Sequence, residues 1–356
     1  MKYRHLHNID FFRIVFTLII LYGHIVQHWM MPQFGQQQFF INLMNHTSYA
    51  FGYFCDMFFI LSGFFMSFSF EKSGGVVFVM RKNIARLWPV LFFSVFCAFI
   101  LSLFKLTYFH KYGNICALLF LDDAYSVNIP TNNGAAWYIN VMFWGYVCYY
   151  CVLKLFDHEK RLYVISLVVF CCYSVLLDKL HLYNQPQMFG IVTIPMVRGI
   201  AGMGLGYLIS EFYRRYTFLP NRSYIRMTLY TVVELFVLYL LIRTAIIKKL
   251  DIAFPIILIC FLLLFFLFLF KKGWVSCLLD RPAVSFMGKY CFSIYMMQEI
   301  MFPIVNRVLW KNSCFGASVF PVFNMICGIM LCIILGVFTY HLVEKPMRNF
   351  LLNRFL

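Results

Sequence analysis

The stretch from Asp10 to Met30 reads DFFRIVFTLIILYGHIVQHWM, and it decides the fold class. About 20 predominantly apolar residues are enough for a helix to cross the hydrocarbon core of a bilayer. Arg13 and His24 interrupt the apolar run, and such residues are costly in lipid and usually mark a functional site. They stand eleven positions apart, which returns them to nearly the same face of a helix about 16 Å apart. The stretch therefore predicts a membrane helix with a functional polar face.

That polar face has more members than these two residues. They follow helical intervals of three, four, seven and four positions, and they are Asp10, Arg13, Thr17, His24 and His28. Asp10 precedes Arg13 by one turn, so we expect the two to pair. The face extends across about half of the membrane and must contact protein or trapped water instead of lipid.

The composition indicates a polytopic membrane protein. Of 356 residues, 62% are hydrophobic and only 12% are charged, whereas about a quarter is usual in soluble domains. The formal net charge of +16 would suit a nucleic-acid partner, but the Lys and Arg residues lie mostly in short connections between apolar runs. There they orient the spans, so we expect no nucleic acid. Because no segment resembling a cleaved signal peptide precedes the first span, we expect that span to remain as a signal anchor.

Apolar runs of about 20 residues predict ten transmembrane helices. The predicted spans are Phe11–Met30, Ala50–Phe70, Leu87–Phe104, Ala136–Leu155, Leu162–Leu177, Phe189–Ser210, Met227–Ile247, Ile252–Phe270, Val284–Val308 and Val319–Val343. Of the 30 Lys and Arg residues, 20 then fall on the side of the two termini, nine on the opposite side, and Arg13 within a span. The cluster of Arg243, Lys248 and Lys249 on the opposite side makes the seventh and eighth spans the weakest part of the prediction. By the positive-inside rule both termini are cytoplasmic. We predict a single integral membrane domain over residues 1–356, with no appended soluble domain.

We expect neither a metal site nor a permanently bound cofactor. The 13 Cys residues are scattered and lie mostly within predicted spans, where Cys behaves as a small apolar residue. His28 follows His24 at helical spacing, but no carboxylate or third His is close to them in the sequence.

Four further patterns carry candidate residues. The second span contains FFILSGFF, in which the small Ser62 and Gly63 allow another helix to approach closely. The third span is entered through RKNIARLWP at 81–89, a basic cluster that suits phosphates and also anionic lipid. The other two patterns are GAAWYIN at 134–140, which opens the fourth span, and YHLVEKP at 340–346 in the tail.

In this order the patterns resemble those of the membrane-bound acyltransferase-3 family, ten-span bacterial enzymes that move acyl groups onto surface sugars. The resemblance runs from Asp10 to about Arg348. It implies that Arg13 and His24 are essential and that the basic run binds a cytoplasmic acyl donor, usually acetyl-CoA. It also implies a multi-pass protein of the bacterial cytoplasmic membrane that acts on a glycan acceptor.

The resemblance assigns roles to further residues. Donor binding is assigned to Arg81, Lys82 and Arg86, and structural or substrate-lining roles are assigned to Ser62, Gly63, Trp137, Tyr138, Tyr295, Glu299 and Glu344. Arg81 and Arg86 stand five positions apart, wider than the Arg-x-x-Arg of many relatives, so the cation that meets the phosphates stays open. Gln298 stands where relatives often carry His, so no role for a second His is implied.

The first span also suggests the chemistry. His24 lies about 20 Å along the helix from its cytoplasmic end, in the outer part of a core roughly 30 Å thick. An imidazole there can take the proton of a hydroxyl that attacks a thioester, or it can carry the acyl group itself. Arg13, held by Asp10, could orient the donor. We therefore predict an O-acyltransferase, with acetyl as the expected acyl group and an extracytoplasmic or lipid-linked glycan as the acceptor.

Several alternatives stay open from the sequence. Glu234, Glu299 or Asp56 could orient His24. A lone intramembrane His is also often an interhelical hydrogen-bonding group. A transporter or flippase could use Arg13 and the basic run to bind an anionic solute, and a noncatalytic scaffold subunit would need neither.

Overall fold

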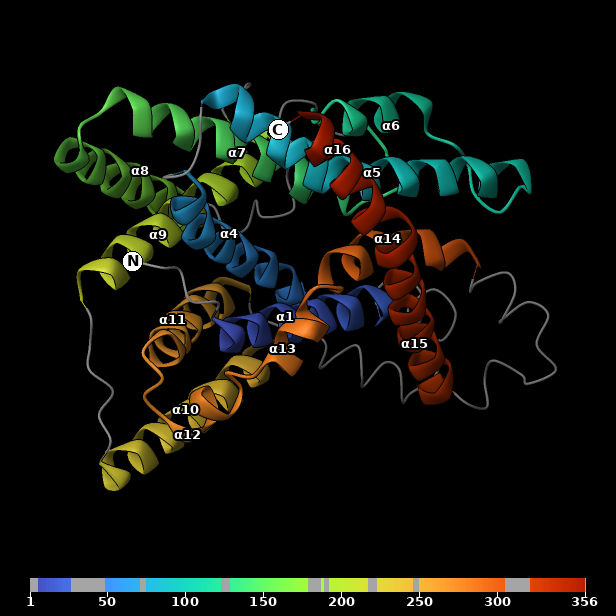
Figure 1. Cartoon of the computed structure of the whole chain (residues 1–356). Coiled ribbons are helices and arrows are strands. Elements are labelled where there is room, and N and C mark those ends of the chain that lie inside the picture. Colours follow the sequence, from blue (N-terminus) through green and yellow to red (C-terminus); the bar gives the residue numbers. More distant parts are fainter. Residues whose placement is uncertain are drawn as a thin grey trace. The chain divides into compact units, whose positions relative to one another are not determined.

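The computed structural model describes residues 6–26, 49–70, 75–122, 129–178, 187–188, 192–216, 223–245, 250–304 and 321–355. These residues are helical apart from connecting turns and one short antiparallel ribbon (Figure 1). The ribbon pairs β1 (Gln187–Met188) with β2 (Val192–Thr193), with Gln187 opposite Thr193. Helices satisfy their backbone hydrogen bonds internally, as a bilayer requires. The predicted helical class is confirmed for the described residues.

The chain forms two compact units, of which unit 1 comprises Met1–Phe58 and Glu211–Cys291. Its helices are α1 (His7–His24), η2 (Tyr49–Tyr53), α10 (Tyr224–Ala245), α11 (Leu250–Leu269), α12 (Trp274–Leu278) and α13 (Pro282–Gly288). In this unit α1 packs against α13, α11 and η2, and α10 packs along α11 (Figure 1).

An aromatic core joins α1 to α11. Phe12 and Phe16 stand one turn apart on α1, and their ring centroids lie 5.5 and 5.4 Å from that of Phe261 in edge-on contacts. Each such contact contributes about 0.5–1.5 kcal/mol beyond the apolar area that it buries. The core thus uses the apolar side of α1, and the side that carries Asp10 and Arg13 is left for polar contacts.

Unit 2 comprises Phe59–Ser210 and Phe292–Leu356. Its helices are the greater part of α4 (Phe54–Phe70), α5 (Val76–Leu103), α6 (Lys111–Leu118), α7 (Ala136–Leu155), α8 (His158–Asp178), most of α9 (Ile194–Arg215), α14 (Cys291–Ile304), α15 (Pro321–Thr339), the π-helical turn η5 (Tyr340–Glu344) and α16 (Lys345–Phe355). Within this unit α5 packs along α7 and α16 (Figure 1).

Two glycines let α4 and α9 cross closely in unit 2. A Cβ atom at Gly63 would overlap the backbone carbonyl of Met203, and one at Gly206 would overlap that of Ile60. A crossing of this kind excludes every larger side chain from both positions. The close helix approach that the Ser-Gly pair predicts is therefore present.

Among the described residues, five helices are long and apolar enough to cross a membrane. They are Phe51–Phe70, Val77–Leu103, His158–Asp178, Tyr224–Thr244 and Ile326–Arg354, and a shorter apolar helix covers Ala253–Leu269. The helix α7 has the same bounds as the predicted fourth span. The structure thus supports several membrane helices, whereas the number ten and the sidedness of the termini stay predictions.

The third predicted span begins earlier than expected. The sequence predicts a start at Leu87, after the basic run, but α5 begins at Val76 and keeps Pro89 in its interior. Proline removes one backbone hydrogen bond, and a membrane helix tolerates this where its neighbours satisfy the freed group. The basic run is therefore displayed on a continuous helix.

The ninth predicted span is divided. The apolar run at 284–308 predicts one helix, but α13 ends at Gly288 and α14 begins at Cys291. A Cβ atom at Gly288 would come within 2.9 Å of Asp10 Cβ, so α13 ends where it packs closely against α1. A contact with a distant segment thus sets a break that apolarity alone does not reveal.

Candidate active site

The polar face of α1 contains an ion pair. Arg13 Nη1 donates a 2.7 Å hydrogen bond to Asp10 Oδ1. The Asp10 side chain is 5% exposed and that of Arg13 is 35% exposed. A nearly buried carboxylate needs such a partner, because an unpaired charge there is costly. The predicted pairing of Asp10 with Arg13 is confirmed.

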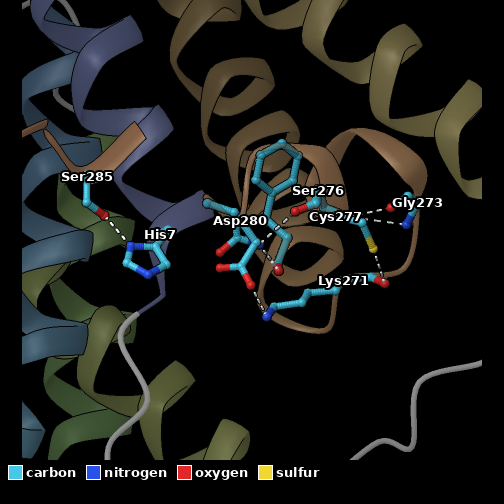
Figure 2. A network of polar contacts seen from close by, with 9 residues as sticks. His7, Lys271, Gly273, Ser276, Cys277, Asp280 and Ser285 are labelled. Carbon is cyan, nitrogen blue, oxygen red and sulfur yellow. Dashed lines mark hydrogen bonds and ion pairs between the residues drawn. The ribbon is translucent and has the colours of Figure 1, made fainter. Parts of the chain in front are cut away.

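The second carboxylate oxygen of Asp10 is held from another helix. Ser285 of α13 donates a 2.6 Å hydrogen bond to Asp10 Oδ2. The same hydroxyl lies 2.7 Å from Nδ1 of His7 at the start of α1 (Figure 2). Neither Ser285 nor His7 is predicted from the sequence to have a role, because Ser285 stands 275 positions away from Asp10. The sequence feature that could have indicated Ser285 is its position as a hydroxyl within the apolar run of the ninth predicted span.

His24 ends α1. Eleven residues of helix separate it from Arg13, which corresponds to about 16 Å. Its ring meets the Phe51 ring of η2 edge-on, with the centroids 5.2 Å apart. Gly23 makes room for that phenyl ring, which a Cβ atom would overlap. The imidazole is thus half-buried beside an aromatic ring that limits its orientation, while His28 lies outside the described residues.

Glu234, one of three carboxylates considered for orienting His24, makes different contacts. It accepts hydrogen bonds from the backbone N–H groups of Gly273, at 3.2 Å, and Ser276, at 3.4 Å. Thr231, one turn earlier on α10, accepts a 2.8 Å hydrogen bond from the backbone N–H group of Trp274. These amide groups belong to the first turn of α12, whose backbone offers them no acceptor. The Gly273 N–H group also lies 3.2 Å from Ser276 Oγ. Glu234 is therefore a structural anchor for α12.

The segment from Lys271 to Asp280 is closed by further contacts (Figure 2). Lys271 and Asp280 form an ion pair across it, and the Cys277 thiol lies 3.5 Å from the Lys271 carbonyl oxygen. Burial raises the pKa of the Cys277 thiol, and Glu234 raises it further, while Lys271 opposes the shift. The segment therefore stabilises unit 1 and provides no reactive thiolate.

The basic run lies on α5 in unit 2. Arg81, Lys82 and Arg86 are all exposed. The Arg86 guanidinium nevertheless lies 5.8 Å from the ring centroid of Tyr146 and interacts electrostatically with Glu344. Arg86 is therefore held near an aromatic face and a carboxylate, which restricts where its charge can lie.

Several of the predicted lining residues gather near Arg86. The Ser62 hydroxyl lies 3.3 Å from Tyr138 OH and 3.5 Å from Met142 Sδ. Arg86 Nη2 lies 3.7 Å from the same sulfur atom. The rings of Tyr138 and Tyr295 meet edge-on with their centroids 5.8 Å apart. Unit 2 thus brings together candidates from three different predicted spans and from the basic run that precedes the third predicted span.

Glu344 also belongs to this part of unit 2. Its carboxylate accepts a 2.6 Å hydrogen bond from Ser293 Oγ on α14. Arg348 Nη1, one turn later in the chain, lies 3.8 Å away. Arg86 on α5 also acts on the Glu344 carboxylate electrostatically. The carboxylate therefore links α14 and α16 within the positive field of Arg86.

The remaining candidates have other neighbours. Trp137 lies under the guanidinium of buried Arg198, 4.8 Å from carbon to ring centroid, and the sequence analysis does not single out Arg198. The Glu299 carboxyl carbon lies 3.8 Å from where a Cβ atom of Gly134 would stand. Gln298 is buried, and neither of its amide atoms has a hydrogen-bond partner among the described residues. All of these residues lie in unit 2.

The described residues contain no group of three His, Cys, Asp or Glu side chains that could bind a metal ion. Cys148 and Cys151 on α7 stand at Cys-x-x-Cys spacing, so the expectation that the chain lacks such a pair is wrong. Both are free cysteines with exposed side chains. A structural zinc site needs four ligands, so this pair alone does not make one.

Comparison with known proteins gives one match. A sequence model of a protein family, described as an acyltransferase domain, matches residues 6–341. No curated protein and no solved structure matches the chain. The matched range includes Asp10, Arg13, His24 and the basic run on α5, and Glu344 lies just beyond it.

Proposed function

Because the chain belongs to the acyltransferase 3 family and is therefore a membrane acyltransferase, we propose that it transfers an acetyl group from cytoplasmic acetyl-CoA to a hydroxyl of an extracytoplasmic or lipid-linked glycan. The proposal places it in the bacterial cytoplasmic membrane, with ten spans and both termini in the cytoplasm. Lys and Arg asymmetry supports this sidedness.

The polar face of α1 is the observation that carries the proposal. Asp10 is nearly buried and paired with Arg13, and the half-buried His24 follows on the same face of the helix. Titratable and charged groups of this kind are expensive in a membrane helix. A lone intramembrane His can also serve as an interhelical hydrogen-bonding group. An imidazole and a guanidinium are, however, suitable groups for proton transfer and for binding an anionic or polarised substrate.

In the proposed reaction His24 takes the proton of the acceptor hydroxyl as its oxygen attacks the carbonyl carbon of the thioester. The new C–O bond forms, the C–S bond breaks, and the CoA thiolate leaves and receives the proton from the imidazolium. Arg13 orients the donor. In the alternative order the imidazole is acylated first, CoA leaves as the thiol, and the hydroxyl then takes the acyl group from His24. Both orders give the same ester and free CoA.

We assign the phosphates of the donor to the basic run, with Arg86 as the main cation. A guanidinium binds phosphate oxygens through two parallel hydrogen bonds, which makes it a better match than a lysine ammonium. The position of the Arg86 guanidinium beside the Tyr146 ring supports this choice, because the ring limits the freedom of its side chain. Arg81 and Lys82 add positive charge on the same helix.

The proposal is tested with purified protein, radiolabelled acetyl-CoA and envelope glycans extracted from the source cells. The wild-type protein should form a labelled ester that mild alkali removes. His24→Ala should lower the rate by at least about 100-fold, because a positioned general base usually contributes that much. His158→Ala, in an exposed histidine at the start of α8, is the matched control and should leave the rate unchanged.

Two results would contradict the proposal. Ester formation by His24→Ala at the wild-type rate would remove His24 from the mechanism. Uptake of an anionic solute into proteoliposomes without any labelled ester would indicate a transporter instead. Size-exclusion profiles of each variant show whether a lost rate comes from lost folding.

A further inference from the structure

Asp10 is held by two helices. On α1 its Oδ1 atom accepts the 2.7 Å hydrogen bond from Arg13, and from α13 its Oδ2 atom accepts the 2.6 Å hydrogen bond from Ser285. The Ser285 hydroxyl in turn lies 2.7 Å from His7 Nδ1 (Figure 2). A chain of short hydrogen bonds therefore runs from His7 through Ser285 and Asp10 to Arg13.

The proton positions in this chain follow from the chemistry of each group. An ionised carboxylate only accepts hydrogen bonds, so the single hydroxyl proton of Ser285 points to Asp10. Ser285 must then accept the proton of its other neighbour, so His7 carries a proton on Nδ1. Each hydrogen bond to the charged Asp10 is of the strong, charge-assisted kind.

The close packing of α13 on α1 makes the Ser285 contact possible. Gly288 stands three positions after Ser285 and faces the same residue, since a Cβ atom at Gly288 would come within 2.9 Å of Asp10 Cβ. A larger side chain at 288 would push α13 away from α1. Two positions of α13 thus fit around the Asp10 side chain.

We propose that Ser285 is a positioning residue for Arg13 and acts through Asp10, an inference that rests on the proposed function of Arg13. Arg13 Nη1 holds Oδ1 and Ser285 holds Oδ2, so the two hydrogen bonds together fix the rotation of the Asp10 carboxylate about its Cβ–Cγ bond. A carboxylate held in one rotation directs its charge-assisted hydrogen bond to the guanidinium in one direction. The guanidinium is thereby kept in an orientation that serves the substrate. Without the hydroxyl, the carboxylate can rotate and the guanidinium moves with it.

The test measures kcat and KM for acetyl-CoA in the labelled-ester assay. Ser285→Ala should lower kcat/KM about tenfold, which corresponds to the lower end of the effect of one hydrogen bond to a charged group. Ser285→Thr keeps the hydroxyl and should restore most of the rate. Met287→Ala, on the exposed side of the same short helix, is the matched control and should match the wild type.

A double variant separates positioning from general damage. If Ser285 acts only through Arg13, then Ser285→Ala should add little to the defect of Arg13→Lys, because residues that act as one unit are not additive. A structural role would lower the rate by the same factor in both backgrounds. If Ser285→Ala does not purify as a monodisperse protein, Ser285→Cys replaces it, because a thiol is only a weak hydrogen-bond donor.

The outcomes distinguish the two proposals. If Arg13→Ala keeps the wild-type rate, the proposed function of Arg13 and the role of Ser285 are both overturned. If Arg13→Ala is inactive while Ser285→Ala equals the wild type, or if the two defects multiply, only the role of Ser285 is overturned. Three results together support the role of Ser285. The kcat/KM of Ser285→Ala falls about tenfold, Ser285→Thr restores most of it, and Ser285→Ala adds little to the defect of Arg13→Lys.

Discussion

Glu234 lies within a predicted span, and its role can be tested by comparing stability with catalytic rate. The structure assigns it to the first turn of α12, where it accepts two backbone N–H groups, and not to His24. Glu234 is 1% exposed, so neither water nor lipid can replace it as an acceptor. We therefore predict that Glu234→Ala destabilises the protein while the folded fraction keeps its catalytic rate.

The magnitude follows from the two contacts. Hydrogen bonds to charged groups contribute about 1.5–3 kcal/mol each. The distances of 3.2 and 3.4 Å exceed the usual length of charge-assisted bonds, so the lower end of the range applies to both. Their sum sets an upper value of about 3 kcal/mol for Glu234→Ala, because the Gly273 N–H group still lies 3.2 Å from Ser276 Oγ. Glu234→Gln keeps one acceptor oxygen and should lose about half of that.

The assay measures unfolding of the purified protein in mild detergent. Denaturant is added stepwise, and tryptophan fluorescence reports the folded fraction. The acetylation rate of each variant is then divided by its amount of folded protein. Glu159→Gln, in an exposed carboxylate at the start of α8, is the control and should change stability by less than about 0.5 kcal/mol. An unchanged unfolding midpoint in Glu234→Ala would refute the structural assignment. A catalytic rate per folded molecule that falls more than about tenfold would instead indicate that Glu234 orients His24.

Two further predictions concern unit 2. Arg86→Ala should raise the KM for acetyl-CoA about tenfold with a smaller change in kcat, and Arg81→Ala should have a weaker effect, because the Tyr146 ring positions the Arg86 guanidinium. Equal effects of the two variants on steady-state kinetics would contradict the choice of Arg86. Gly63→Val should destabilise the crossing of α4 and α9 by about 3 kcal/mol or prevent folding, because its side chain would collide with the Met203 backbone, and a variant with the wild-type unfolding midpoint would show that the crossing is loose.

The local features of the fold and site could be read from the sequence. The low share of charged residues and the long apolar runs predict membrane helices, and α7 begins and ends where its run predicts. The pairing of Asp10 with Arg13 also follows from sequence, because residues three positions apart meet on any helix. Each of these properties depends only on neighbouring residues.

Contacts between distant segments could not be read in this way. Ser285 holds Asp10 across 275 positions, Arg198 stacks on Trp137, and Glu234 anchors α12. The apolar run that predicts the ninth span gives no sign of the break after Gly288, because that break coincides with a contact to α1. The sequence separation between these partners is too large for the helical repeat to indicate that they meet.

The sequence by itself determined that this chain is helical, belongs in a membrane and carries an arginine and a histidine on one face of its first helix. Helical geometry repeats every few residues, so it orders side chains along one segment without reference to any other. Only the tertiary structure decided which groups surround Asp10, Arg86 and Glu234, because packing chooses among the many segments that share the same apolar composition.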